Sequence, residues 1–219
     1  LLIKGILITS LVGTASCVSP YFTRAPKDKI EQSSMVSKPA LDGLLYTTSD
    51  SASTPPDSSL SNVKAEILSE HEVSSLVDCV YNKISSKRKI PSYLSKKFFE
   101  DAILVESSRN IYAESDKGAK GLMQLMPDAW DQVETDDSLR YNIPKDSYDF
   151  AFDPVKNVEN GIKYYLWINS FCSKQCPNWE TLSAEEKGNM INGAYNFGAP
   201  GLRDLGWNVE NTPHETRSH

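Results

Sequence analysis

The sequence is poor in positive charge and in long apolar segments. It has 23 Lys and Arg residues against 29 Asp and Glu residues, which gives a net charge of −6 over 219 residues. It therefore lacks the broad basic surface that non-specific binding of DNA or RNA requires, and we expect no nucleic-acid partner. With 39% hydrophobic and 24% charged residues, the composition suits one globular domain with appendages.

The N-terminus has the pattern of an export signal. The segment Leu1–Val12 holds an apolar core of about nine residues, well short of the ~20 that span a bilayer, so a transmembrane anchor is disfavoured. Small residues then lead to Cys17, which is typical of a secretory signal peptide over residues 1–16. The pattern also resembles a bacterial lipobox, in which Cys17 is acylated after cleavage. Cleavage after Ser16 without a lipid is the alternative. We expect an exported, periplasmic protein that a lipid on Cys17 anchors to the outer membrane.

Residues 17–62 have the composition of a flexible tether. From Thr48 to Asn62, ten of fifteen positions are Ser, Thr or Pro. Such a segment buries too little apolar surface to offset its ordering entropy. We predict a disordered linker over residues 17–62 and a folded domain over residues 63–219.

The sequence has only four cysteines, at positions 17, 79, 172 and 176. Export permits disulfides, and if Cys17 carries a lipid the simplest arrangement is one bridge and one free thiol. The short spacing favours a bridge between Cys172 and Cys176, and a bridge from Cys79 to either is the alternative. We expect no metal or other cofactor, because no His lies near this CxxxC pair and His71-Glu72 lacks the second His of a zincin helix.

From Val63 onward the apolar residues recur with the period of a helix, and no segment alternates as a strand, so we predict a compact all-α domain. In the second predicted helix, the apolar stripe is Leu94, Phe98, Ala102 and Val105. The first two expected helices run from a capping box at Ser69 to about Ser86 and from a cap at Ser92 to Ser107 or Ser108. The other three run from Pro127 to about Val133, from Asp153-Pro154 through Phe171, and from Ser183 to Asn196 before Gly198.

Glu106 lies at the end of the second predicted helix. It follows Ala102 and Ile103 by one turn and Phe99 by two, so helix geometry places its carboxylate over an apolar patch. Desolvation there raises the pKa of the carboxyl. A carboxyl that stays protonated near neutral pH is what a general acid for glycosidic cleavage requires. Periodicity alone favours an ordinary solvated surface Glu, because most Glu residues near helix ends are of that kind.

Several short motifs follow in a fixed order. Glu106-Ser107-Ser108 is followed by GAKGLMQLMP from Gly118 to Pro127, by Phe152-Asp153-Pro154, by Ala194-Tyr195-Asn196 and by Glu215-Thr216-Arg217. In this order they resemble the catalytic domain of the soluble lytic transglycosylases, over residues 106–217. The resemblance implies a fold similar to goose-type lysozyme. It also implies cleavage of the β-1,4 bond between N-acetylmuramic acid (MurNAc) and N-acetylglucosamine (GlcNAc) in peptidoglycan.

The resemblance implies a reaction without water, in which Glu106 is the single catalytic residue. Glu106 first protonates the leaving glycosidic oxygen and then takes the proton from the MurNAc C6 hydroxyl as that oxygen attacks C1. The product is a 1,6-anhydroMurNAc end, so the enzyme would be a carbon–oxygen lyase. Because the nucleophile belongs to the substrate, the second carboxylate of most glycosidases is not needed.

The motifs also imply substrate contacts. Gly118 and Gly121 bracket a turn that a sugar could approach closely, or an ordinary turn. Met123 offers an apolar surface to a sugar face or belongs to the core, and Gln124 offers both a donor and an acceptor to acetamido groups. The remaining implied contacts are Ser115, Tyr195 and Asn196 near the catalytic Glu, and Glu215, which binds a distal sugar or peptide or pairs with Arg217.

The chain departs from the family pattern in three places. AYNFGAPG stands where AYNAGPG is usual, and Arg109-Asn110-Ile111 stands where FNP is common. The family continues beyond the ETR motif with a further helix, whereas this chain stops at His219, so we expect the closing helix to be missing.

Two other functions compete with a lytic transglycosylase. A goose-type lysozyme-like hydrolase needs an acid that orients water, and Ser115 stands where those lysozymes carry an aspartate, although the adjacent Asp116 keeps this alternative open. A non-catalytic envelope lipoprotein that only binds peptidoglycan is the second alternative. Glu106 argues against it, because a binding protein has no use for a desolvated acid.

Overall fold

The computed structural model describes residues 66–212. The chain divides into two units, Leu1–Asn62 and Val63–His219, and the described residues lie in the second. The predicted signal peptide, Cys17, the linker and Glu215 lie outside the described residues. None of the helices within residues 66–212 has the length and apolar character needed to cross a membrane.

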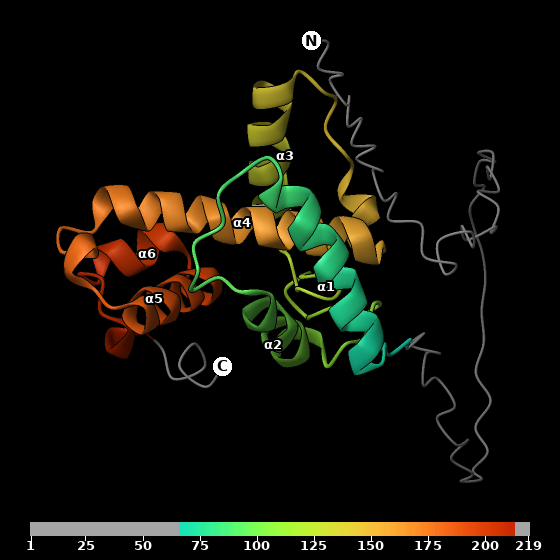
Figure 1. Ribbon diagram of the computed structural model, residues 1–219, viewed down its shortest axis with the longest axis horizontal. Coiled ribbons are helices and arrows are strands. Elements are labelled where there is room, and N and C mark those ends of the chain that lie inside the picture. Colours follow the sequence, from blue (N-terminus) through green and yellow to red (C-terminus); the bar gives the residue numbers. More distant parts are fainter. Residues whose placement is uncertain (1–65, 213–219) are drawn as a thin grey trace, which may run out of the picture. The chain divides into compact units, whose positions relative to one another are not determined.

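The described part of the chain is helical and contains no strand, only isolated bridges, so the predicted all-α class is confirmed (Figure 1). Short 3-10 segments cover Tyr148–Phe152, Trp179–Thr181 and Val209–Asn211. The helices are α1 (Glu70–Ser85), α2 (Lys96–Ser107), α3 (Pro127–Tyr141), α4 (Pro154–Gln175), α5 (Ala184–Phe197) and α6 (Ala199–Asp204).

Side-chain caps start three of these helices where the sequence predicts them. Ser69 before α1 and Ser183 before α5 each form a capping box with the Glu three residues later. Before α4, the carboxylate of Asp153 accepts a hydrogen bond from the backbone N–H of Lys156, and Pro154 occupies the first turn. These starts are confirmed because each depends on residues close together in the sequence.

The predicted start of α2 is wrong, and its predicted apolar stripe is confirmed only in part. Ser95, not Ser92, accepts the capping hydrogen bond, from the backbone N–H of Phe98. Leu94 is fully buried, but from the turn that precedes the helix. The buried face of α2 carries Phe99 and Ile103, whereas Val105 is 48% exposed. Phe98 and Ala102 of the predicted stripe are partly buried and pack against the core, so the prediction misses the centre of the buried face and wrongly includes Val105.

Helix α3 continues to Tyr141, well beyond the predicted end at Val133. The prediction was too short because the inner face of this part of the helix is polar. Glu134 and Asp137 are buried there. Glu134 accepts hydrogen bonds from the Asn160 side chain and the backbone of Asp146, and Asp137 pairs with Arg88 and Lys163. Apolar periodicity cannot detect a helix face that packs through charges. Helix α4 also extends past Phe171 to Gln175, and the short helix α6 was not predicted.

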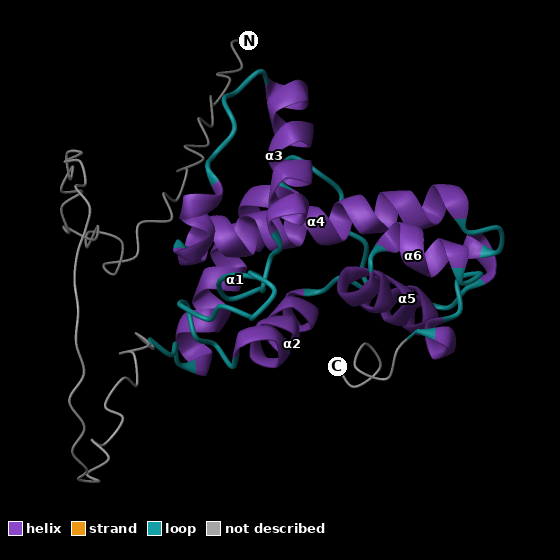
Figure 2. Ribbon diagram, turned by 180° about the vertical axis from the view of Figure 1, so that it is seen from behind, coloured by secondary structure: helices purple, strands orange, loops and turns teal. Residues whose placement is uncertain are grey.

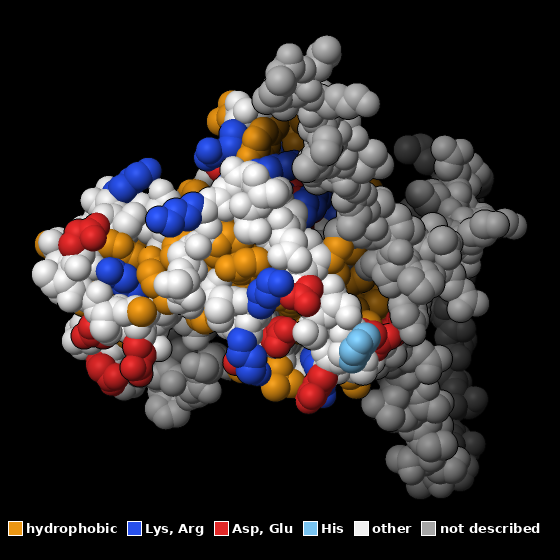
Figure 3. Space-filling view, viewed as in Figure 1, with side chains coloured by type: hydrophobic (Ala, Val, Ile, Leu, Met, Phe, Trp, Pro, Cys, Tyr) orange, Lys and Arg blue, Asp and Glu red, His pale blue; other side chains and the backbone are white. Residues whose placement is uncertain are grey.

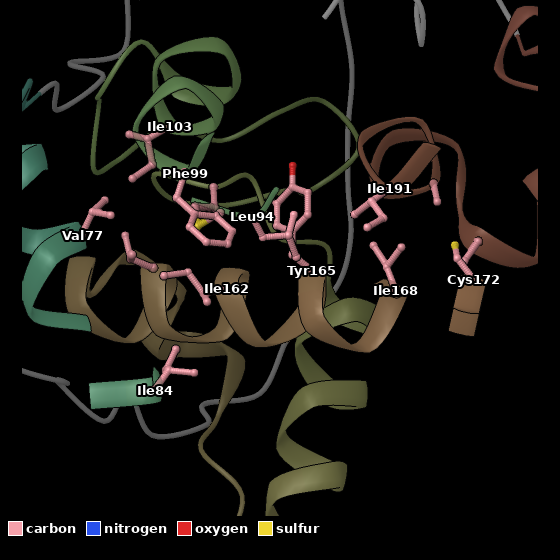
Figure 4. Packing of buried hydrophobic residues seen from close by; sticks show 14 of the residues in the cluster. Val77, Ile84, Leu94, Phe99, Ile103, Ile162, Tyr165, Ile168, Cys172 and Ile191 are labelled. Atoms are coloured by element: carbon pink, nitrogen blue, oxygen red, sulfur yellow. The ribbon is translucent and has the colours of Figure 1, made fainter. Parts of the chain in front are cut away.

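Helix α4 forms the centre of the core. Its residues Val158, Ile162, Tyr165, Ile168 and Cys172 are fully buried at helical spacing. Helix α1 packs against one half of α4 and also against α2, helices α5 and α6 pack against the other half, and α3 stands crosswise to α4 (Figure 2). Within the cluster, the hydroxyl of Tyr165 points away from the α4 axis (Figure 4).

The predicted cysteine bridges are wrong. Cys172 and Cys176 are both free and buried, which excludes a bridge between them and a bridge from Cys79 to either. Cys172 packs in the apolar core, and the thiol of Cys176 donates to the side-chain oxygen of Asn178 at 3.1 Å. Each sulfur thus has its own surroundings at the end of α4.

The loop of residues 113–126 is fastened to α4 by a buried amide. Asn157 is fully buried; its side-chain nitrogen donates to the carbonyl oxygens of Lys120 at 2.9 Å and Ala151 at 2.7 Å. Its side-chain oxygen accepts from the backbone N–H of Met123 at 2.8 Å. The Tyr148 hydroxyl lies 2.6 Å from the carbonyl oxygen of Gly118 and holds the tip of the same loop. These bonds give an irregular segment one defined position.

Two glycines of this loop have left-handed backbones for different reasons. A Cβ atom on Gly121, with φ +78°, would lie 2.3 Å from the Ala151 carbonyl oxygen and from the Asn157 side-chain nitrogen. A Cβ atom on Gly118, with φ +84°, would meet no atom within 4 Å. The protein itself, rather than a sugar, therefore requires glycine at position 121.

We expect these two glycines to differ in their tolerance of alanine. Gly118→Ala should lower the free energy of unfolding by roughly 1–2 kcal/mol, the cost of a left-handed backbone for a residue with a Cβ atom. Gly121→Ala should lower it by at least about 3 kcal/mol, because overlap with a backbone carbonyl adds to that cost. Urea unfolding followed by circular dichroism measures both values, and equal losses would contradict the packing role of Gly121.

Candidate active site

Glu106 lies in the last turn of α2, and its carboxyl is partly buried. Among residues 66–212, no side chain or backbone group forms a hydrogen bond or an ion pair with this carboxyl. Burial raises its pKa from 4.5 to about 7. The predicted direction of the pKa shift is confirmed, and its cause is desolvation rather than a neighbouring charge.

Two stacked tyrosines lie beside this carboxyl. The rings of Tyr165 in α4 and Tyr195 in α5 are nearly parallel, with centroids 4.2 Å apart. Burial raises both pKa values well above 10, and the charge of Glu106 contributes to each shift. Glu106, Tyr165 and Tyr195 therefore meet at one place, where α2, α4 and α5 converge.

Neither tyrosine donates its hydrogen to Glu106. The Tyr195 hydroxyl donates to the backbone oxygen of Met123 at 2.5 Å, and the Tyr165 hydroxyl donates to the side-chain oxygen of Asn192 at 3.2 Å. Since each hydroxyl has one hydrogen, none is left to stabilise an ionised Glu106. The rings form an apolar wall, and this wall favours the protonated acid.

The loop of residues 113–126 presents two polar side chains. The Gln124 side-chain nitrogen donates to the backbone oxygens of Ala113 and Gly121, at 3.0 and 2.9 Å, while no described residue donates to its side-chain oxygen. Gln124 can therefore offer an acceptor to a ligand, but not the predicted donor. The Ser115 hydroxyl accepts from the backbone N–H of Ala119 at 3.0 Å, so its hydrogen remains for another partner.

The side chain of Met123 does not suit the predicted contact with a sugar. It is fully buried, and its sulfur lies over Gly161, where a Cβ atom would be 2.2 Å away. The structure places Met123 in the core, which was the alternative interpretation. Its contribution to the site is the backbone oxygen that fixes Tyr195.

Asn196 follows Tyr195 near the end of α5 and carries a buried amide nitrogen. No described residue accepts a hydrogen bond from this nitrogen. A buried donor without a partner is costly, so its position marks where the acceptor of a ligand could be bound. Glu215, the last predicted substrate contact, lies outside the described residues.

Sequence reasoning missed the residues that hold the site in place, above all Asn157 and Tyr165. Asn157, Gly161 and Tyr165 follow one another at intervals of four residues, so they lie on one face of α4. A polar Asn in an otherwise apolar stripe was the available signal. Tyr148 carried no comparable pattern in the sequence.

The backbone turns sharply directly after the helix of Glu106. Ser108 and Arg109 both adopt left-handed conformations, with φ of 51° and 68°, which is unusual for residues other than Gly, Asn and Asp. Backbone pairing holds this turn: the Leu68 N–H donates to the Arg109 carbonyl, and the Ile111 N–H donates to the Glu66 carbonyl, both at 3.0 Å. The segment of residues 66–68 thus fixes the chain that follows Glu106.

Glu106→Gln should stabilise the protein at high pH. The pKa of Glu106 is raised in the fold, so the native state loses stability as pH rises from about 4.5 to 7 and has lost it fully above pH 7. Gln carries no charge, so the variant should be more stable at pH 8 by up to about 3 kcal/mol and similar to the original protein at pH 4. Thermal unfolding at both pH values measures this, with Glu185→Gln, an exposed acid of α5, as the control. Equal stability of the Glu106→Gln variant and the original protein at pH 8 would contradict the desolvation of Glu106.

Comparison with protein families gives a match to the Transglycosylase SLT domain over residues 83–216, more than half of the chain. The matched range contains Glu106, the loop of residues 113–126, Asn157, Tyr165 and Tyr195. A comparison with curated proteins gives no match. Members of the SLT family are lytic transglycosylases that act on peptidoglycan, and the resemblance seen in the sequence is confirmed. The chain belongs to the Transglycosylase SLT domain family.

Proposed function

We propose that the protein is a peptidoglycan lytic transglycosylase in which Glu106 acts first as acid and then as base. The observation that carries this proposal is the isolated, partly buried carboxyl of Glu106 with a pKa of about 7. Near neutral pH such a carboxyl is present in both protonation states in comparable amounts. It can therefore give a proton in one step and take one back in the next.

In the first step the protonated Glu106 transfers its proton to the glycosidic oxygen between MurNAc and GlcNAc, and the bond from that oxygen to C1 breaks. In the second step the MurNAc C6 oxygen bonds to C1, and the C6 hydroxyl proton returns to the Glu106 carboxylate. No water is consumed. The products are a GlcNAc hydroxyl end and a 1,6-anhydroMurNAc end.

The surroundings of Glu106 favour this route over hydrolysis. A retaining or inverting hydrolase places a second carboxylate within about 5–9.5 Å of the acid. Burial accounts for the pKa shift of Glu106, and no second carboxylate within residues 66–212 contributes to it. Asp116, the residue that kept a hydrolase in question, is exposed on the loop.

The polar groups of the site complement an acetamido sugar. Gln124 offers an acceptor for the amide N–H, while Asn196 and Ser115 offer donors for carbonyl or hydroxyl oxygens. We assign these three residues to substrate binding together with Tyr195, which positions the wall beside the acid. The alternative of a binding protein without catalysis does not explain why Glu106 has no partner among residues 66–212, at a cost in stability.

We further propose that the protein acts in the periplasm after export, with a lipid anchor on Cys17. The substrate supports this location, because peptidoglycan lies outside the cytoplasm. The composition of residues 17–62 supports a tether between such an anchor and the domain.

Product analysis tests the proposal directly. Mass spectrometry of purified peptidoglycan treated with the protein should show anhydromuropeptides, each lighter by one water than the reducing form. Glu106→Gln should lower their yield by at least about 10³-fold, because the proton donor is lost, while Glu185→Gln should retain full yield. Reducing muropeptides would establish a hydrolase instead, and the absence of any product from folded protein would favour the binding protein.

The pH dependence of the rate should report the same carboxyl. Because the free enzyme must carry a protonated Glu106, kcat/KM should fall by about tenfold for each pH unit above 7. Initial rates of glycan cleavage between pH 5 and 9 measure this, with circular dichroism to verify that the fold persists. A profile that stays flat to pH 9 would exclude Glu106 as the acid.

A further inference from the structure

A row of aromatic rings leads away from Glu106 along α4. Tyr164 meets Tyr195 edge to face at 5.5 Å between ring centroids and stacks on Trp167 at 5.7 Å. Trp167 in turn stacks on Phe171 at 5.6 Å. The three α4 rings lie on one side of the helix, are all partly exposed, and extend the wall of the site by ~10 Å of helix length.

The outer two rings line a groove with a volume of about 620 Å³. The groove lies between α3, α4 and the segment that follows α1. Its charged lining residues are Asp136 and five cations, namely Lys87, Arg88, Lys89, Arg140 and Lys174. On a chain with a net charge of −6, this is a local excess of positive charge.

Three of these cations have no acidic partner within the described part of the chain. Arg88 pairs with Asp136 and Asp137, and Arg140 pairs with Asp136. Lys87, Lys89 and Lys174 form no ion pair there, and all three are exposed. Figure 3 shows Lys and Arg side chains beside apolar surface on one face of the protein. Free ammonium groups next to aromatic rings suit a ligand that carries both carboxylates and apolar surface.

We propose that this groove binds the acidic peptide that a MurNAc residue carries, while the aromatic row supports the sugars between that peptide and Glu106. The inference rests on the proposed function, since the row begins at Tyr195. A peptidoglycan strand has the two chemistries that the groove offers in the same order: uncharged sugars with apolar faces, and side branches with free carboxylates. The groove would therefore make the enzyme prefer strands that retain their peptides.

Binding measurements in the Glu106→Gln protein test the groove without turnover. The probes are soluble glycan strands with their peptides and the same strands after enzymatic removal of the peptides. The double variant Lys89→Gln/Lys174→Gln should raise the dissociation constant for peptide-bearing strands about 5–10-fold and leave that for stripped strands unchanged. Trp167→Leu should weaken the binding of both strands, because it removes a ring of the row.

Lys97→Gln is the matched control. Lys97 is an exposed lysine of α2 outside the groove, where it pairs with Asp101, and its loss should change neither dissociation constant. The expected loss on peptide-bearing strands should also shrink as salt is raised from 50 to 500 mM.

Three outcomes would overturn the proposal. The first is that the double variant binds peptide-bearing strands as well as the Glu106→Gln protein does. The second is that it loses affinity equally for both strands. The third is that it loses affinity for vesicles with anionic phospholipids but not for the peptide-bearing strands, which would assign the groove to a lipid headgroup. Because these measurements do not depend on catalysis, a failure of the proposed reaction would appear separately, as missing anhydro products.

Discussion

The hydrogen bonds of one buried amide, that of Asn157, hold together the parts that form the site. This side chain satisfies three backbone groups of the chain around it, including the N–H of Met123. Because the Met123 carbonyl in turn accepts the hydrogen bond of Tyr195, the position of the aromatic wall depends on the position of the loop. A loop without regular structure is thus held in one defined position, and α4 positions both this loop and the aromatic wall.

The contrast between Glu106 and the other buried acids explains its chemistry. Asp137 pairs with Arg88 and Lys163, and Glu134 accepts two hydrogen bonds. Burial alone would raise the pKa of Glu159, but Lys163 and Lys83 lower it overall. The fold therefore gives each of these three acids a cation or hydrogen-bond donors that offset the cost of its burial. Among residues 66–212 nothing compensates Glu106 in this way, and burial therefore keeps its carboxyl largely protonated up to a pKa of about 7.

Local signals in the sequence predicted what depends on near neighbours. Caps at Ser69, Asp153 and Ser183 could be predicted, as could the apolar surroundings of Glu106 at one helical turn. The length of α3 could not, because Glu134 and Asp137 are buried only through their pairing with Asn160 and Lys163 of α4 and with Arg88 after α1. The same limit applies to the loop. The motif does not tell which of the neighbours Met123 and Gln124 is buried, because the packing of Met123 against Gly161 decides this.

The pairing of residues 66–68 with residues 109–111 has a mechanical consequence. Tension on the chain at the start of the domain reaches the hydrogen bond between Leu68 and Arg109 before it reaches α4. From there it acts on the left-handed turn at Ser108 and Arg109, and so on the end of α2 that carries Glu106. A pull at the start of the domain is therefore borne first by the backbone hydrogen bonds that hold the turn after Glu106, and not by the packing of α4.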